Sequence, residues 1–162
     1  MARKNAASTP ATVALTATGI SFTPHPYLHD PAAASFGLEA AEALGVDADR
    51  VFKTLLADVD GTLVVGVVPV TAQLDLKLLA MAVGGKRAAM AEPALAERRT
   101  GYVVGGISPI GQRSRLRTVI DGSATTWASV FVSGGRRGLD IELSPLDLIT
   151  VTGATLAAIA RR

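Results

Sequence analysis

The feature that most constrains the fold is a pair of apolar segments, 51–57 and 63–70, which flank the residues Asp58-Val59-Asp60-Gly61. Runs of this length that are rich in valine and leucine are typical of buried strands. An Asp-Gly pair forms a tight turn because glycine accepts a positive φ. The sequence therefore predicts an antiparallel hairpin that packs into a hydrophobic core.

Lys53 places a charge inside the first of these strands, in the run Val51-Phe52-Lys53-Thr54-Leu55-Leu56. Removing an ammonium group from water costs free energy unless a partner or a polar cleft compensates. One hypothesis is that Lys53 has a functional role. The other is that it lies on an edge strand, with its aliphatic stem along the sheet and its head in water.

Glycine, proline and capping residues divide the rest of the chain into short helices and strands. Helices are predicted over 11–18, 38–44, 76–83 and 93–99 and from Pro145 onward, and further strands over 20–27, 87–90, 102–104, 119–120, 130–133 and 139–143. The strands and helices do not alternate regularly, which indicates one α+β domain around a mixed sheet. This domain is predicted to span residues 9–162, after a flexible leader, residues 1–8.

Composition excludes several classes of protein. Of the 162 residues, 49% are hydrophobic and 19% are charged, which is typical of a compact globular protein. The apolar stretches are too short to span a membrane and the N-terminus lacks the apolar segment of a signal peptide, so we expect a cytoplasmic protein. The chain has no cysteine, which excludes disulfides, thiolate zinc sites, iron–sulfur clusters and a cysteine nucleophile.

Arginines are concentrated in the second half of the chain, although the formal net charge is only +2. Such clustering predicts a basic face that contacts phosphates, and ordinary solvated arginines are the alternative. The residues concerned are Arg98, Arg99, Arg113, Arg115, Arg117, Arg136 and Arg137.

The two histidines, His25 and His29, have the spacing of a helical metal-binding pair. Pro24 and Pro26 oppose a helix there, so capping or hydrogen bonding in the core is the better interpretation. A serine–histidine triad is also disfavoured, because the chain has no G-x-S-x-G turn.

Two glycine-rich loops, 101–112 and 133–138, are candidates for ligand binding. Neither matches a phosphate-binding loop or a dinucleotide-binding motif. Glycine allows a ligand to approach the backbone closely, so bare N–H groups can bind an anion or a carbonyl oxygen. The alternative is that both loops are simply tight turns.

At these positions the chain resembles the YbaK/EbsC family, the free-standing relatives of the bacterial prolyl-tRNA synthetase editing domain. The resemblance is to the branch that deacylates cysteinyl-tRNA(Pro), and it covers nearly the whole chain after the leader. It is carried by Tyr27-Leu28-His29-Asp30-Pro31, Phe36-Gly37, Phe52-Lys53-Thr54-Leu55, Gln73-Leu74-Asp75-Leu76-Lys77, and the segments 101–112 and 132–142.

The resemblance implies a mixed, barrel-like sheet surrounded by helices, with no metal or cofactor. It implies trans-editing of tRNA(Pro) mischarged with cysteine, with the acceptor end of the tRNA and prolyl-tRNA synthetase as partners. In this branch the thiol of the substrate attacks its own carbonyl and releases free tRNA.

The resemblance also implies roles for individual residues. Lys53 matches the critical lysine of the family, and Gly105, Gly106 and Ile107 match the loop whose backbone faces the aminoacyl ester. Residues expected to bind substrate are Tyr27, Phe36, Thr54, Ser108, Ser133 and Asp140. Residues expected to bind tRNA are Arg113, Arg115, Arg136 and Arg137.

Two departures from the family pattern concern the surface expected to face tRNA. Lys77-Leu78 stands where relatives often have two lysines, and segment 112–115 has one basic residue fewer. These departures concern the affinity for tRNA more than the chemistry. Two alternatives to the Cys-tRNA(Pro) deacylase stay open. One is an Ala-tRNA(Pro) hydrolase of the same superfamily, and the other is a non-catalytic module that binds tRNA or the synthetase.

Overall fold

The computed structural model describes residues 8–162, so the predicted leader lies outside the described residues except for Ser8. The predicted hairpin is present as β2 (Phe52–Val59) and β3 (Thr62–Pro69). Its strands pair antiparallel over their full length, and the turn places Asp60 at φ 51° and Gly61 at φ 90°. The Gly61 N–H donates to Asp58 Oδ1 over 2.7 Å, which fixes the turn.

The hairpin is the centre of a five-stranded sheet with the order β5-β2-β3-β6-β9. β5 (Ala88–Met90) pairs antiparallel with β2, whereas β6 (Arg117–Asp121) and β9 (Thr155–Ala157) continue the sheet in parallel pairs. This combination of pairings confirms the predicted mixed sheet and α+β class.

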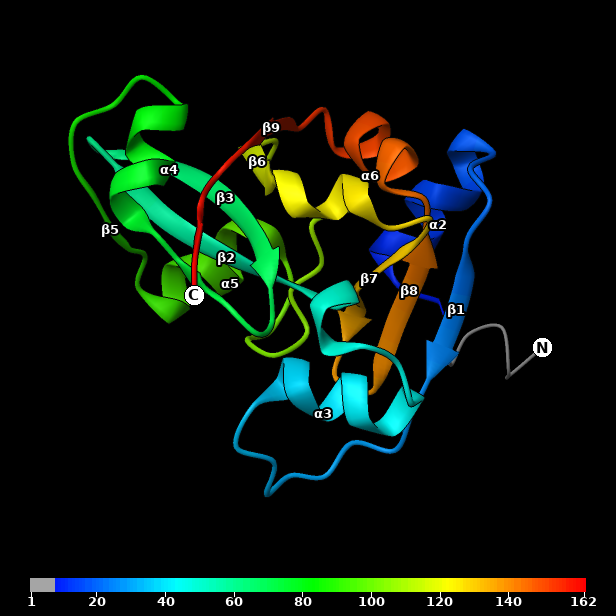
Figure 1. Ribbon diagram of the computed structural model, residues 1–162. Helices are drawn as coiled ribbons and strands as arrows, with labels where there is room; N and C mark the ends of the chain where they lie inside the picture. The colour runs from blue at the N-terminus through cyan, green and yellow to red at the C-terminus, as the bar shows by residue number, and fades with distance from the viewer. Residues whose placement is uncertain (1–7) are drawn as a thin grey trace.

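A second hairpin, β7 (Val130–Arg136) and β8 (Leu139–Leu143), forms a three-stranded sheet with β1 (Thr23–Pro26) at its edge. Two further short strands, β4 (Gln73–Leu74) and β10 (Ala160–Arg161), pair with each other. Within residues 8–162 the strands form separate sheets rather than a closed barrel. A single parallel bridge, Val51 to Phe131, joins the two larger sheets, which lie side by side in Figure 1.

The predicted helices are present, with the caps that the sequence indicates. They are α2 (Pro10–Thr18), α3 (Phe36–Leu44), α4 (Leu76–Ala82), α5 (Pro93–Thr100) and α6 (Pro145–Thr152), with short 3-10 helices η1 (Ala48–Arg50) and η2 (Gly122–Thr126). Thr9, Asp75 and Ser144 each accept a hydrogen bond from the first turn of their helix. No helix in the described part of the chain is both long and apolar enough to cross a bilayer.

The predicted strand over 102–104 is wrong. Gly101 caps α5 in a left-handed conformation, φ 82°. The Val104 N–H then donates to the Glu97 side chain, and the Gly106 N–H donates to the Val103 carbonyl. These contacts fold the segment into a turn, so it offers no continuous edge to a neighbouring strand.

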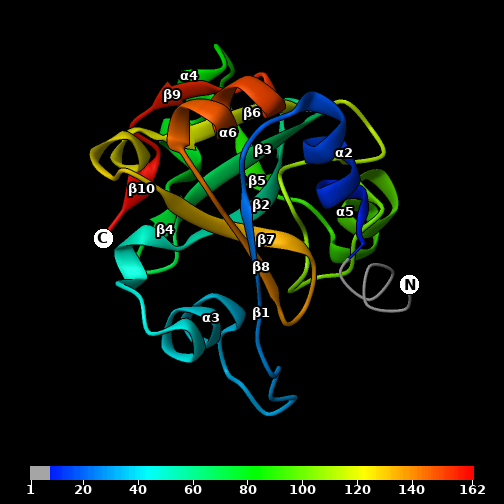
Figure 2. The same ribbon diagram turned by 90° about the vertical axis from the view of Figure 1, so that its right-hand side faces the viewer.

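Three hydrophobic clusters hold the elements in place. The largest packs α2 and α6 against both large sheets, and a second packs α4 against β3 and β6. A third, smaller cluster attaches α3 through Ala40 and Ala41 to Val51, Val70 and Phe131. Figure 2 shows α3 at the opposite end of the molecule from α4 and α6. Because Val51 and Phe131 also form the bridge between the two sheets, α3 borders the junction of these sheets.

Candidate active site

A cavity lies where β2 separates from its neighbours on one side. At Val51 this side bridges to Phe131 of β7, and from Ala57 onward it pairs with β5. Between these points no strand covers it within residues 8–162, and a cavity of 410 Å³ is found there. Lys53 is therefore both an edge-strand residue and a residue of a cavity wall.

The walls of the cavity come from segments that are far apart in the sequence. They are the beginning of α3, the first half of β2, the segment from β5 into α5, the glycine loop 101–112, and the β1–β8–β7 sheet. Of the residues expected at the site, the structure brings together Tyr27, Phe36, Lys53, Thr54, Gly105, Ile107, Ser133 and Asp140.

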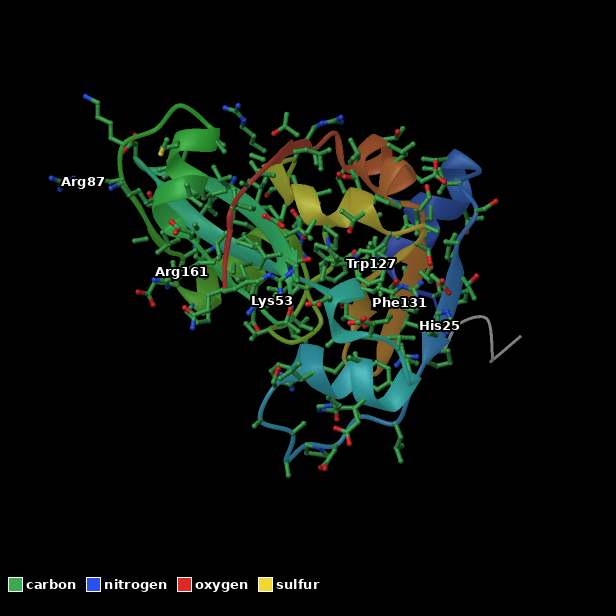
Figure 3. The ribbon with its side chains drawn as sticks, in the orientation of Figure 1. His25, Lys53, Arg87, Trp127, Phe131 and Arg161 are labelled. Carbon is green, nitrogen blue, oxygen red and sulfur yellow. The ribbon has the colours of Figure 1, made fainter. Side chains whose placement is uncertain are left out.

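Lys53 is partly buried and lies near the middle of the molecule in Figure 3, with α3 below it. No acceptor lies within hydrogen-bonding or ion-pairing distance of its ammonium group in the described part of the chain. Burial without a partner lowers the pKa of Lys53 below the ordinary value for a lysine. The cavity thus contains a cation that is available to a ligand.

Asp140 is the opposite charge in the cavity, and its side chain is 5% exposed. No group of residues 8–162 donates a hydrogen bond to its carboxylate. Burial raises the pKa of Asp140 to about 7. Tyr27, which also lines the cavity, has a pKa raised to about 12 by its own burial and then by the Asp140 charge.

Two hydroxyl groups line the same space. Thr54 Oγ1 is buried and has no hydrogen-bond partner in the described structure. Ser133 Oγ accepts a hydrogen bond from the Gly135 N–H over 3.2 Å, so its own proton remains free to reach a ligand. An unpaired buried hydroxyl costs free energy, which a ligand that bonds to Thr54 would recover.

The glycine loop adds backbone donors. The N–H groups of Gly105 and Ile107 donate to no acceptor within residues 8–162, and both residues line the cavity. Gly106 differs, because its N–H is used by the Val103 carbonyl at 2.8 Å. Of the three loop residues expected to face an ester, two therefore have free amides.

Ser108 lies away from the cavity wall. It is fully buried, its hydroxyl accepts from the Ile110 N–H, and its carbonyl accepts from the Gln112 side chain over 2.9 Å. Ser108 shapes the far end of the loop, and the structure does not bring it to the other predicted site residues.

The four arginines expected to bind tRNA fall into two groups. Arg113 and Arg115 are exposed and lie beside the last turn of α5, because the N–H groups of Arg113 and Ser114 donate to the carbonyls of Thr100 and Arg99. This arrangement places Arg98 and Arg99, also exposed, next to them. Arg136 is partly buried with an unpaired Nε, and Arg137 bonds to the Val104 carbonyl.

The two histidines form hydrogen bonds with glutamates. His25 Nε2 lies 2.9 Å from Glu142 Oε1, and His29 Nδ1 lies 2.8 Å from Glu39 Oε1. Neither histidine lines the cavity. The preferred interpretation is thus correct in that both histidines form hydrogen bonds, but they form them at partly exposed positions and not in the core.

Sequence reasoning missed one wall of the cavity, formed by Met90, Ala91, Pro93 and Ala96. These residues continue from β5 into α5, and their place depends on how far β5 extends along β2. The sequence contains one indication that β5 leads directly into α5, since Pro93 ends the strand pattern and begins a helix.

The chain is similar to known proteins over most of its length. The family model described as "Aminoacyl-tRNA editing domain" matches residues 30–151. A protein of Enterococcus faecalis named "Putative Cys-tRNA(Pro)/Cys-tRNA(Cys) deacylase EbsC" is 39% identical over 123 residues, which are 75% of each chain.

Two solved structures are similar in fold. One is described as "a putative trans-editing enzyme for prolyl tRNA synthetase"; it is 25% identical, with a TM-score of 0.80 and coverage of 96% of this chain and 99% of that one. The other, "hypothetical protein APE2540", is 25% identical, with a TM-score of 0.85 and coverage of 94% and 100%.

Proposed function

The chain belongs to the aminoacyl-tRNA editing domain family, and on this premise we propose that it is a trans-editing deacylase that clears Cys-tRNA(Pro). The observation that carries the proposal is the collection of unpaired polar groups in one cavity. A cation, a carboxylate, a hydroxyl and two backbone amides line this space without partners in the described structure. Because unpaired buried polar groups are costly, their concentration here is best explained by a polar ligand.

Each group matches a part of an aminoacylated 3′ end. Asp140 would bind the α-ammonium of the amino acid, since a charge-assisted pair is strong where water is excluded. The free amides of Gly105 and Ile107 would donate to the ester oxygen as negative charge develops on it. One such donor is worth roughly 3 kcal/mol of barrier. Lys53 would bind the terminal ribose or phosphate, or stabilise the leaving oxygen.

The nucleophile would come from the substrate. The cysteine sulfur forms a bond to its own carbonyl carbon, the ester C–O bond breaks, and the thiol proton passes to the departing ribose oxygen. The products are a cyclic thioester and free tRNA. Two observations support this route: the chain has no cysteine, and neither histidine lines the cavity to activate a serine or threonine. Holding the thiol near its carbonyl can supply several kcal/mol of the barrier.

A second candidate is hydrolysis of Ala-tRNA(Pro), and the observation that favours it is Asp140. A carboxyl group with a pKa of about 7 in a cavity is suited to accept a proton from water at neutral pH. In that case Asp140 would act as a general base instead of an ammonium ligand.

The partners would meet the protein outside the cavity. The exposed arginines Arg98, Arg99, Arg113 and Arg115 would contact phosphates of the tRNA(Pro) acceptor arm, and prolyl-tRNA synthetase would supply the mischarged tRNA. Affinity based on phosphate contacts decreases with salt, by about one unit of log–log slope for each contact. A salt titration of tRNA binding to Arg113→Gln and Arg115→Gln would measure these contacts.

The deciding experiment is a deacylation assay of the full chain with Cys-, Ser- and Ala-tRNA(Pro). Cyclisation predicts rapid release of cysteine, with the serine and alanine esters largely intact. Equal rates for cysteine and serine would exclude the thiol route, and a preference for alanine would establish the hydrolase. Binding without release of any amino acid would indicate a non-catalytic module.

A further inference from the structure

We propose that Arg137 is a positioning residue that aims the Gly105 amide into the cavity. This inference rests on the proposed deacylase function, because that amide is taken as a donor to the ester oxygen. It also changes the role expected for Arg137, from a ligand of tRNA phosphate to a support of the glycine loop.

The contacts of Arg137 join three segments of the chain. Its Nε and Nη2 atoms both donate to the Val104 carbonyl oxygen, over 2.9 and 2.7 Å. The guanidinium carbon lies over the Phe36 ring, 4.9 Å from the ring centre. Arg137 belongs to the β7–β8 turn, Val104 to the glycine loop and Phe36 to the first turn of α3.

The Val104 carbonyl and the Gly105 N–H belong to the same peptide unit. This unit is planar and trans, so its C=O and N–H bonds point in opposite directions. When Arg137 holds the oxygen, it also fixes the direction in which the hydrogen points. A cationic donor on the carbonyl additionally polarises the amide and strengthens it as a donor.

The loop fits closely against the turn that carries Arg137. A Cβ atom on Gly105 would lie 2.9 Å from Arg137 Nε and 3.0 Å from the Phe36 ring. A Cβ atom on Gly106 would lie 2.8 to 2.9 Å from the backbone of Arg136 and Arg137. The Gly-Gly pair thus allows the loop to rest directly on the turn, which keeps the carbonyl within reach of the guanidinium.

Arg137 differs in this respect from Arg113 and Arg115, the other exposed arginines expected to bind tRNA. A guanidinium has five N–H donors in a fixed plane. In Arg137 two of them are used by one carbonyl and one face is covered by an aromatic ring. In Arg113 and Arg115 the side chains have no hydrogen-bond partner within residues 8–162, as expected for groups whose donors are free to bind a phosphate.

The test compares Arg137→Lys and Arg137→Gln with the matched control Arg87→Lys. Arg87 is exposed and lies far from Lys53 in Figure 3. Lysine keeps the charge but cannot donate two parallel bonds or stack as a plane. We expect kcat for Cys-tRNA(Pro) to fall at least tenfold in both Arg137 variants, while KM and the Kd for uncharged tRNA stay within twofold of the unmutated protein.

The opposite pattern would overturn the proposal. A phosphate ligand predicts a weaker Kd, a salt slope reduced by about one, and rescue by lysine. A second measurement does not need activity: hydrogen exchange of the Gly106 N–H, which bonds within the loop, should be at least fivefold faster in Arg137→Lys. Unchanged exchange would refute the inference, whereas an unmutated protein that releases no cysteine but shows this change would refute only the proposed function.

Discussion

Asp140 and Glu142 are two carboxylates on one face of β8, and they differ in almost every physical respect. Glu142 Oε1 bonds to His25, and Oε2 accepts from Ser129 at 2.5 Å and from Arg50 at 3.3 Å. These bonds, with Ser129 first, hold the pKa of Glu142 below its usual value. Asp140 has no such bond, and burial raises its pKa to about 7.

The difference separates an end of the sheet whose polar groups pair with one another, here called the structural end, from an end that borders the cavity. At the Glu142 end the polar groups satisfy one another, and the Arg50 guanidinium also covers Phe131 at 5.0 Å. Figure 3 shows His25, Trp127 and Phe131 together on this side. At the Asp140 end the Asp140 carboxylate, the Lys53 ammonium and Thr54 Oγ1 border a cavity and lack partners within residues 8–162. Under the proposed function these two carboxylates, whose pKa values are shifted in opposite directions, would have different tasks, Glu142 in stability and Asp140 in binding.

The strongest test of this contrast is Lys53→Met. Lysine and methionine have similar reach, so the change removes the charge without opening a large void. We expect kcat/KM for Cys-tRNA(Pro) to fall by about hundredfold or more, the scale of a lost electrostatic stabiliser. The free energy of unfolding should not fall, because a desolvated, unpaired ammonium is removed. Loss of stability together with activity would mean that Lys53 is structural.

Asp140→Asn tests the other charge through the pH dependence of stability. The raised pKa means that native Asp140 binds a proton where the unfolded chain has released it, so its contribution to stability falls as pH rises toward 7 and is constant above. The variant lacks this loss. Its free energy of unfolding relative to the unmutated protein should increase by up to about 1.4 kcal/mol per pH unit between pH 5 and 7.

Urea unfolding of both proteins at several pH values measures this difference. Groups such as Glu142 titrate equally in both proteins and cancel from the comparison. A difference that stays flat from pH 5 to 8 would show that a partner stabilises the Asp140 carboxylate.

Gly105→Ala, compared with Gly61→Ala, separates backbone strain from site geometry. Both glycines have nearly the same φ, 89° and 90°, but an added Cβ at Gly61 meets nothing within 4 Å. Each change should cost about 1 kcal/mol of stability from the left-handed backbone. Only Gly105→Ala should also lower kcat, by roughly tenfold, because the Cβ displaces Arg137 and Phe36. Equal activities in the two variants would remove the loop from the mechanism.

The sequence predicts the elements of this fold better than it predicts which of their groups are unpaired. Caps and turns such as Thr9, Ser144 and Asp60-Gly61 act locally, so the helices and both hairpins could be predicted. The segment 102–104 is apolar enough for a strand, but the Glu97 side chain accepts a hydrogen bond from the Val104 N–H and holds the segment in a turn. That contact is local in space and invisible in a hydrophobic pattern.

The candidate site divides in the same way. The resemblance to a family gathered Lys53, Asp140 and Gly105 as candidates, and the cavity brings them together. The resemblance could not distinguish Arg137 from Arg113, because both are arginines in basic glycine-rich segments. The Val104 carbonyl, 33 residues from Arg137 in sequence, is what separates them. Pairing is a tertiary property, so sequence alone does not decide which charges are free.

Glu142→Gln is the smallest expected effect and the test of the structural end. Glutamine keeps the shape of glutamate and one acceptor oxygen, so part of the contact with Ser129 or His25 can persist. Arg50 loses its counter-charge, and a partly exposed network of this kind should then lose about 1 kcal/mol of unfolding free energy. Because Glu142 does not line the cavity, kcat/KM should change less than threefold. Urea unfolding and the deacylation assay at one pH measure both quantities, with Asp140→Asn as the reciprocal case. A large loss of activity without loss of stability in Glu142→Gln would show that both ends of the sheet face belong to one functional site.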